Sequence, residues 1–222
     1  PTTEKCDGKD NDCDGQIDNG CPYIPEKVGT VAGFPQAVAV SKSWAAVSLR
    51  DTKKVAIYDN SKANAPKLGE VPVPEAPYGI QIVSDNAYVA TDKTIQKIDM
   101  VRKQASELVK TQEAASQNGQ MVELGGRLYT RLWKKGAQSK DSILKFCRTD
   151  PNVPKIECKA ATGGFDSAGY GVALWRSTGT GLMLSDQGLH FIDILNLNEN
   201  PKQRLAVTAD VLDIAMDTGK PI

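Results

Sequence analysis

A three-strand pattern recurs along this 222-residue chain, and it constrains the fold more than any other feature. The first copy runs from Pro35 to Asp59, PQAVAVSKSWAAVSLRDTKKVAIYD, where short apolar or alternating runs are separated by polar turn residues. Further copies span Pro77–Asp99 and Ala168–Asp193, and a divergent copy spans Asn118–Cys147, where cysteine replaces the closing aspartate. Comparable first-strand positions are spaced by 42, 40, 52 and 42 residues: Ala37, Gly79, Gly119, Gly171 and Asp213.

A fourth strand is expected after each three-strand unit. Four strands in about 40 residues is the period of a β-propeller blade. The sequence therefore predicts an all-β fold, a β-propeller of four-stranded blades, with about four complete blades and the start of a fifth in an incomplete ring. The expected fourth strands are Lys67–Val73, Ala105–Thr111, Pro154–Ala160 and Gln203–Thr208.

The chain divides into three predicted parts. Residues 1–21 form a small Cys/Asp-rich metal-binding segment, residues 22–27 a linker containing proline, and residues 28–222 the propeller repeats. A helix over Ile98–Ala115 is a competing interpretation, but the register of the repeats favours strand and loop there. The blades are expected near residues 33–73, 74–111, 116–160 and 166–208, with a partial blade over 211–222.

The predicted ring does not close within these residues. Val28–Ala32 would serve as an outer strand of the last blade, of which only the first strand is found, at Val211–Ile222. Four blades and one strand leave open sheet edges and exposed apolar faces, which favour aggregation. We therefore expect the chain to be a fragment, or another polypeptide to supply the remaining blades. The alternative is a compact four-blade ring with the last strand as a tail.

The run from Asp10 to Asp18 has the ligand spacing of an EF-hand type of calcium loop. Acidic residues stand at relative positions 1, 3, 5 and 9, and Gly15 at position 6 permits the sharp turn. Position 12 is Cys21 in place of the usual bidentate glutamate, so Asp7 is the candidate for the remaining ligand. The predicted metal ligands are Asp7, Asp10, Asp12, Asp14, Gln16 (through its carbonyl) and Asp18.

The segment Cys6–Cys21, CDGKDNDCDGQIDNGC, resembles the MopE-type metal-binding motif of bacterial secreted proteins, usually written CDGxDNDCDGxxDEGC. It departs from that motif only at Asn19, and it is also similar to thrombospondin type 3 and dockerin calcium loops. The motif is named from a copper-repressible surface protein. Carboxylate ligands without histidine nevertheless favour Ca²⁺, or another divalent metal, over copper. An acidic tail without metal is the alternative.

The first, second and fourth repeat units resemble LVIVD-type repeats of bacterial surface proteins, which belong to the wider propeller superfamily. The resemblance extends loosely from Val28 to the end of the sequence. It implies the same fold that the strand period predicts.

Five cysteines bear on the redox environment. Cys147 and Cys158 flank RTDPNVPKIE, whose prolines suit a reversing loop, so we expect a disulfide that closes a hairpin. Two reduced thiols are the alternative in a cytosolic protein. Cys6, Cys13 and Cys21 are further candidates, and any single bridge among them leaves one cysteine over.

No residue is assigned to catalysis. His190, the only histidine, falls in a predicted strand, where a structural role is commoner than that of a base. Asp59, Asp99 and Asp193 recur at the ends of third strands and are expected to cap turns. A ring of functional carboxylates is the alternative reading.

The balance of charges limits the classes of binding partner that the sequence suggests. Lys plus Arg and Asp plus Glu both number 27, so a basic nucleic-acid binder is disfavoured, and no apolar run approaches the roughly 20 residues of a membrane span. The sequence favours a noncatalytic module that binds protein or glycan at an extracellular, cell-surface or periplasmic location. A subunit of a larger surface assembly is a variant of this function. The alternative is a propeller enzyme or redox subunit whose active residues lie in the missing blades.

Overall fold

The computed structural model of the chain describes residues 33–62, 64–111, 117–134, 143–160, 172–175, 179–185 and 188–199. The chain separates into two compact units, Pro1–Thr30 and Val31–Ile222, and all described residues belong to the second. Every regular element among them is a β-strand. No helix in this part of the chain has the length and apolar character needed to cross a membrane.

The first and second sheets are antiparallel four-stranded meanders, each formed by consecutive strands paired in chain order. Apolar and small residues recur along their strands, and many of these residues pack in a layer between the two sheets. The first sheet contains β1 (Pro35–Val40), β2 (Trp44–Leu49), β3 (Lys54–Asp59) and β4 (Lys67–Pro72). The second contains β5 (Pro77–Val83), β6 (Asn86–Thr91), β7 (Thr94–Asp99) and β8 (Gln104–Lys110).

The third and fourth sheets repeat this meander. In the third, β9 and β10 are joined by Gly125 and Gly126, whose φ angles of 60° and 78° suit the tight hairpin turns that need positive φ at both residues. The third sheet contains β9 (Gln117–Leu124), β10 (Arg127–Lys134), β11 (Ile143–Asp150) and β12 (Val153–Ala160). The fourth contains β13 (Val172–Trp175), β14 (Thr180–Ser185), β15 (Gly188–Asp193) and β16 (Asn198–Glu199).

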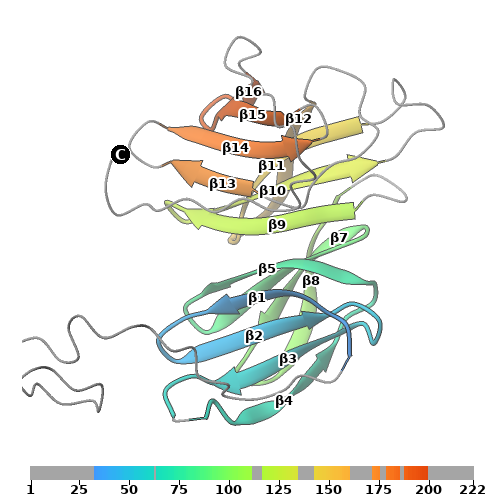
Figure 1. Cartoon of the computed structure of the whole chain (residues 1–222), viewed down its shortest axis with the longest axis vertical. Helices are drawn as coiled ribbons and strands as arrows, with labels where there is room; N and C mark the ends of the chain where they lie inside the picture. Colours follow the sequence, from blue (N-terminus) through green and yellow to red (C-terminus); the bar gives the residue numbers. More distant parts are fainter. Residues whose placement is uncertain are drawn as a thin grey trace, which may run out of the picture. The chain divides into compact units, whose positions relative to one another are not determined.

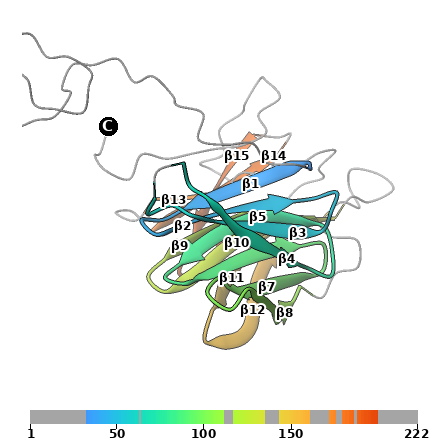
Figure 2. The ribbon, with the colours of Figure 1, turned by 90° about the horizontal axis from the view of Figure 1, so that it is seen from below.

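The first strands of successive sheets lie against one another. β1 contacts β5, β5 contacts β9, and β9 contacts β13, so the four sheets follow each other in chain order (Figure 1). Figure 2 shows the same sheets from below. The predicted all-β architecture of four-stranded units is confirmed, and the described sheets do not close into a ring.

Most predicted strand positions are correct to within about one residue. The expected fourth strands at residues 67–73, 105–111 and 154–160 correspond to β4, β8 and β12. The alternative helix is wrong for residues 98–111, which contain the end of β7, a turn and β8. In the fourth sheet the outer strand is β16, which the repeat pattern did not indicate, and Gln203–Thr208 lies outside the described residues. So do Val28–Ala32 and the partial blade at 211–222.

Apolar layers between the sheets form the core. Ala39, Ala46 and Ile57 of the first sheet pack with Ile80 and Val89 of the second. A second layer joins Tyr88 and Ile95 to Met121 and Leu128, and a third joins Leu144 and Phe146 to Ile192 and Ile194. Each large side chain buried in this way contributes about 1.5–3 kcal/mol of transfer free energy.

Hydrogen bonds between sheets accompany the apolar layers. The Trp44 indole donates to Asp85 Oδ1 at 2.9 Å, which ties the first sheet to the β5–β6 turn of the second. The buried Ser48 hydroxyl donates to the Tyr78 carbonyl at 2.8 Å. Arg148 donates to the carbonyls of Ile194 and Leu195 at 3.2 and 2.9 Å and so joins the third sheet to the fourth.

An aspartate ends the third strand of every sheet and caps the turn that follows. Its carboxylate accepts a backbone N–H two or three residues on, an arrangement typical of turns. Hydrogen bonds from these turns hold the pKa of Asp59, Asp99 and Asp193 below the usual range. The bonds run to Asp59 from Ser61 (3.1 Å), to Asp99 from Arg102 (2.8 Å), to Asp150 from Asn152 (2.8 Å) and to Asp193 from Leu195 (2.9 Å).

These contacts confirm the predicted turn caps and correct one detail. Cys147 does not take the place of the closing aspartate, because β11 continues for three more residues to Asp150. Asp150 makes the same turn contact as its counterparts in the other sheets.

Gly181 marks a close approach between the third and fourth sheets. A Cβ atom at this position would lie 2.7 Å from Phe146 Cζ, closer than real side chains pack. We predict that Gly181→Ala lowers the free energy of unfolding by about 1–3 kcal/mol through overpacking. Urea denaturation of the variant and of the unchanged protein measures this difference in the free energy of unfolding. In a Phe146→Leu background the added cost of Gly181→Ala should shrink, since the ring is gone; equal costs in both backgrounds would contradict this account.

Candidate functional site

The predicted metal ligands lie outside the described residues. This holds for Asp7, Asp10, Asp12, Asp14, Gln16 and Asp18, and for the candidate cysteines Cys6, Cys13 and Cys21. In the part of the chain that the structure describes, no group of three or more His, Cys, Asp or Glu residues is placed to hold a metal ion. The metal site therefore remains a prediction from sequence.

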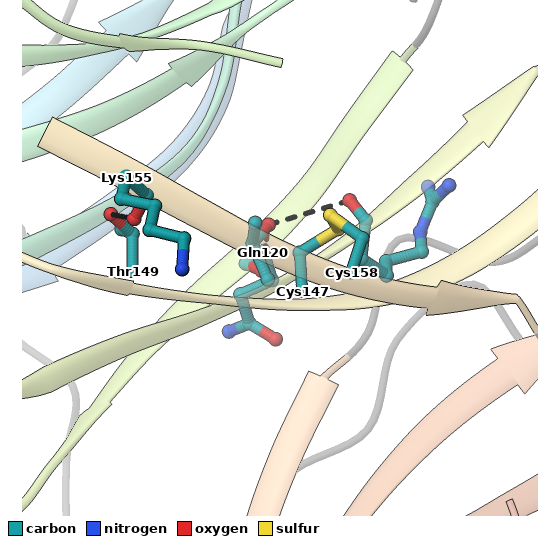
Figure 3. Close-up of a disulfide and its surroundings, with 7 residues drawn as sticks. Gln120, Cys147, Thr149, Lys155 and Cys158 are labelled. Carbon is teal, nitrogen blue, oxygen red and sulfur yellow. Dashed lines mark hydrogen bonds between the residues drawn. A yellow bond between two sulfur atoms is a disulfide. The ribbon is translucent and has the colours of Figure 1, made fainter. Parts of the chain in front are cut away.

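The predicted disulfide between Cys147 and Cys158 is present. The two residues are directly paired in the register of β11 and β12, with a Cα–Cα distance of 4.1 Å. Figure 3 shows the sulfur–sulfur bond across this hairpin, with Thr149 and Lys155 also on it; the Thr149 hydroxyl donates to the Lys155 carbonyl at 2.8 Å. The predicted reversal between two strands is confirmed, and it is short: only Pro151 and Asn152 separate β11 from β12.

A disulfide across an 11-residue separation should stabilise the chain by about 2–4 kcal/mol. We therefore expect reduction with dithiothreitol, and the double variant Cys147→Ala/Cys158→Ala, to lower Tm by similar amounts. Differential scanning fluorimetry provides the comparison. Dithiothreitol should have little further effect on the double variant; a second large drop would show that another bridge dominates.

A cavity of about 270 Å³ lies among the first strands of three successive sheets. Strands β1, β5 and β9 each contribute to its wall, so residues distant in the sequence meet there. The lining residues are Gln36, Ala37, Val38, Tyr78, Gly79, Ile80 and Gln120.

Two irregular strand segments shape this cavity. The pairing register shifts between Pro35 and Ala37 in β1 and between Pro77 and Ile80 in β5. Such shifts re-aim side chains and backbone groups out of the regular ladder. The buried Ser48 hydroxyl holds both segments in place, because it accepts the Ala37 N–H at 3.0 Å and donates to the Tyr78 carbonyl.

Two side-chain amides supply the polar character of the cavity. Gln36 comes from β1 and Gln120 from β9, and both are half-buried. The Gln120 Oε1 atom is buried and has no hydrogen-bond partner among the described residues. A buried acceptor without a partner is costly, so a donor from a ligand or water would stabilise it. The pair can donate and accept hydrogen bonds without carrying charge.

His190 is placed away from this lining, in β15. Its side chain is fully buried, and Nδ1 lies 2.7 Å from Glu199 Oε1 on β16. The contact joins the last two strands of the fourth sheet. This is the structural role that the sequence favours for a histidine in a strand.

A second hollow, of about 210 Å³, lies beside the disulfide hairpin and has mixed charge. Arg148 is one of its lining residues, and sequence reasoning missed it because no motif marks it. Its guanidinium contacts Glu157 at 2.6 Å as well as the two carbonyls of the fourth sheet. Hydrogen bonds from Arg148 and Lys155 lower the pKa of the Glu157 carboxyl. Arg148 therefore links the third sheet to the fourth through its guanidinium group.

Comparisons with known proteins identify the fold. No family model and no curated protein matches the chain. Similar solved structures include the extracellular domain of BT4673 from B. thetaiotaomicron, with a TM-score of 0.59, 14% identity, and coverage of 88% of this chain and 26% of that one. A nidogen/laminin complex matches with a TM-score of 0.57 and 10% identity, and the match covers 74% of this chain and 62% of that one. BamB from Moraxella catarrhalis matches with a TM-score of 0.55 and 13% identity, and the match covers 75% of this chain and 49% of that one.

Identities of 10–14% show the fold alone. BamB and the nidogen domain are β-propellers, and this chain is a β-propeller of four-stranded blades. It spans less than two thirds of the length of each of these structures. In a propeller the first strand of each blade lies innermost, so the cavity among β1, β5 and β9 faces the propeller axis.

Proposed function

We propose that this chain is a noncatalytic β-propeller module that binds a protein or glycan partner through the inner-strand cavity. The observation that carries the proposal is the position of Gln36 and Gln120 on the innermost strands of two blades, with a buried amide oxygen that lacks a partner among the described residues. Rigid blades with exposed loops suit such a role, because they present fixed groups around a channel.

The chemistry of the lining indicates the class of ligand. Two neutral amides and apolar walls match the hydroxyl or amide groups of a sugar or an extended peptide, which both donate and accept hydrogen bonds. The phenol of Tyr78 is the lining group that can titrate, and its ring lies under the guanidinium of Arg50, with Arg50 Cζ 5.3 Å from the ring centroid. A lining of two amides, apolar groups and one phenol suits ligand binding better than acid–base catalysis.

The binding proposal predicts a dependence on two glutamines. Glycan and peptide arrays probed with the labelled chain should show selective binding, and Gln36→Leu/Gln120→Leu should weaken it by roughly tenfold or more through loss of hydrogen bonds. Gln104→Leu is the matched control, since Gln104 lies exposed on the outer strand β8. Unchanged binding by the double variant would place the site elsewhere, and an absence of binding on both arrays would count against the module.

We further propose that residues 6–21 hold one Ca²⁺ ion in a structural role, at an extracellular, cell-surface or periplasmic location. The spacing of the carboxylates and the MopE-type resemblance support the metal, and the Cys147–Cys158 disulfide supports an oxidising compartment. Extracellular calcium modules bind with dissociation constants of roughly 10⁻⁴–10⁻³ M.

Calcium binding can be measured by isothermal titration calorimetry on the intact chain. We expect one site per chain, abolished in Asp10→Asn/Asp12→Asn because two ligand charges are lost, and retained in the control Glu107→Gln on β8. Chelation should lower Tm without altering binding on the arrays. Equal calcium affinity in the double variant, or a preference for copper over Ca²⁺, would contradict the assignment.

A further inference from the structure

The cavity among β1, β5 and β9 offers a sugar no open aromatic surface from its described lining residues. Tyr78 is the aromatic side chain among them, and it is only 3% exposed. One face of its ring lies under the guanidinium of Arg50, at 5.3 Å from Arg50 Cζ to the ring centroid. The C–H groups on the flat face of a sugar ring pack well on an aromatic ring only where that ring is accessible. The described lining therefore does not favour a glycan.

The wall that β5 contributes to the cavity is backbone outside the regular ladder. Pro77 and Ile80 are paired with β6, whereas Tyr78 and Gly79, which lie between them, have no partner in the β5–β6 register. β5 is also an edge strand of its sheet, and Figure 1 shows it between β1 and β9. Backbone groups on the open side of an edge strand can pair with another extended chain.

Gly79 is the position in this wall that a second backbone can approach. Glycine has no side chain, and a glycine within a strand often marks a site where a ligand or another backbone comes close. Gln36 lies opposite a similar irregularity, because the β1–β2 register shifts between Pro35 and Ala37. Two irregular strand segments and one glycine therefore line the same cavity, as an extended chain would require.

The described lining of the cavity is uncharged and contains one acceptor that needs a donor. Gln36 and Gln120 contribute amides, and no Asp, Glu, Lys or Arg is among the described lining residues. The buried Gln120 Oε1 has no partner among the described residues, and a peptide N–H is a suitable donor to it. Val38, which is 62% exposed, adds an apolar wall for an uncharged side chain.

The size of the cavity suits a short part of a longer chain. Its volume of about 270 Å³ lies below the range of about 300–1,000 Å³ that is typical of sites for drug-sized ligands. A few residues of an extended peptide can occupy such a space while the rest of the peptide continues outside it.

We propose that this cavity binds an extended peptide segment with uncharged side chains, and not a glycan. The peptide backbone runs beside Gly79 at the open edge of β5, and one of its N–H groups donates to Gln120 Oε1. The amide of Gln36 is the second polar group available to the peptide. This inference rests on the proposed binding function and narrows its ligand to one chemical class.

Arrays of acetylated and amidated hexapeptides, probed beside glycan arrays with the labelled intact chain, test the class of ligand. We expect selective binding to hexapeptides whose central residues are uncharged, and no selective binding to glycans. Single N-methylations of the strongest hexapeptide then remove one backbone N–H at a time and keep every side chain. By fluorescence anisotropy, one of these changes should weaken binding by roughly tenfold or more, because it removes the donor to Gln120.

A variant of the protein tests whether Gln120 is the acceptor. Gln120→Met keeps the length of the side chain and removes its oxygen, so it should also weaken binding of the hexapeptide by roughly tenfold. In this variant the critical N-methylation should cost much less, since the acceptor is already absent. Gln104→Met on the exposed strand β8 is the matched control and should bind as the unchanged chain does.

The outcomes distinguish this inference from the proposed function on which it rests. Selective binding to glycans, or a preference for charged hexapeptides, would overturn the inference and leave the binding module in place. An absence of binding on both arrays would count against the module itself. A hexapeptide that tolerates N-methylation at every position would overturn the inference too, and this measurement needs no variant that could misfold. Equal costs of N-methylation in Gln120→Met and in the unchanged chain would exclude Gln120 as the acceptor.

Discussion

Packing of one apolar sheet face on the next is the interaction on which this structure depends. Each four-stranded sheet is too small to bury its own side chains, so Ala39, Ile57 and Val71 are protected only because the second sheet supplies Ile80 and Ile82. The same relation recurs at the next two interfaces. Stability therefore accumulates along the series of blades, and any blade face without a neighbour is a site of potential association.

Local polar contacts keep each blade in register, so that its two faces meet their neighbours correctly. A slip of one residue would turn every inward side chain outward. The aspartates that end the third strands pin the turns, Ser48 holds the irregular segments of β1 and β5, and the disulfide pairs β11 with β12. Because Ser48 holds the strand irregularities at the innermost edge, it also helps to shape the cavity that Gln36 and Gln120 line.

Much of the fold could be read from the sequence because its signals are local and periodic. Short apolar or alternating runs such as Trp44–Leu49, and the return of the three-strand pattern at spacings of 40 to 52 residues, indicate four-stranded units. The strand ends of the divergent third unit were harder to predict from the sequence. Cys147 stood where an aspartate was expected, and the prolines of RTDPNVPKIE suggested a loop, whereas the pairing with β10 and β12 extends β11 to Asp150. The short β16 has too few residues for any pattern to reveal it.

By itself the sequence determined the repeat, the strand order within each blade, the turn-capping aspartates and the pairing of Cys147 with Cys158, because each depends on residues close together in the chain. The predicted metal-binding segment at residues 6–21 rests on the sequence alone. Only the tertiary structure decided which residues meet across blades: Arg148 with the fourth sheet, Gly181 with Phe146, and Gln36 with Gln120 around one cavity. Such contacts arise from the twist and stacking of whole sheets, which no short stretch of sequence encodes.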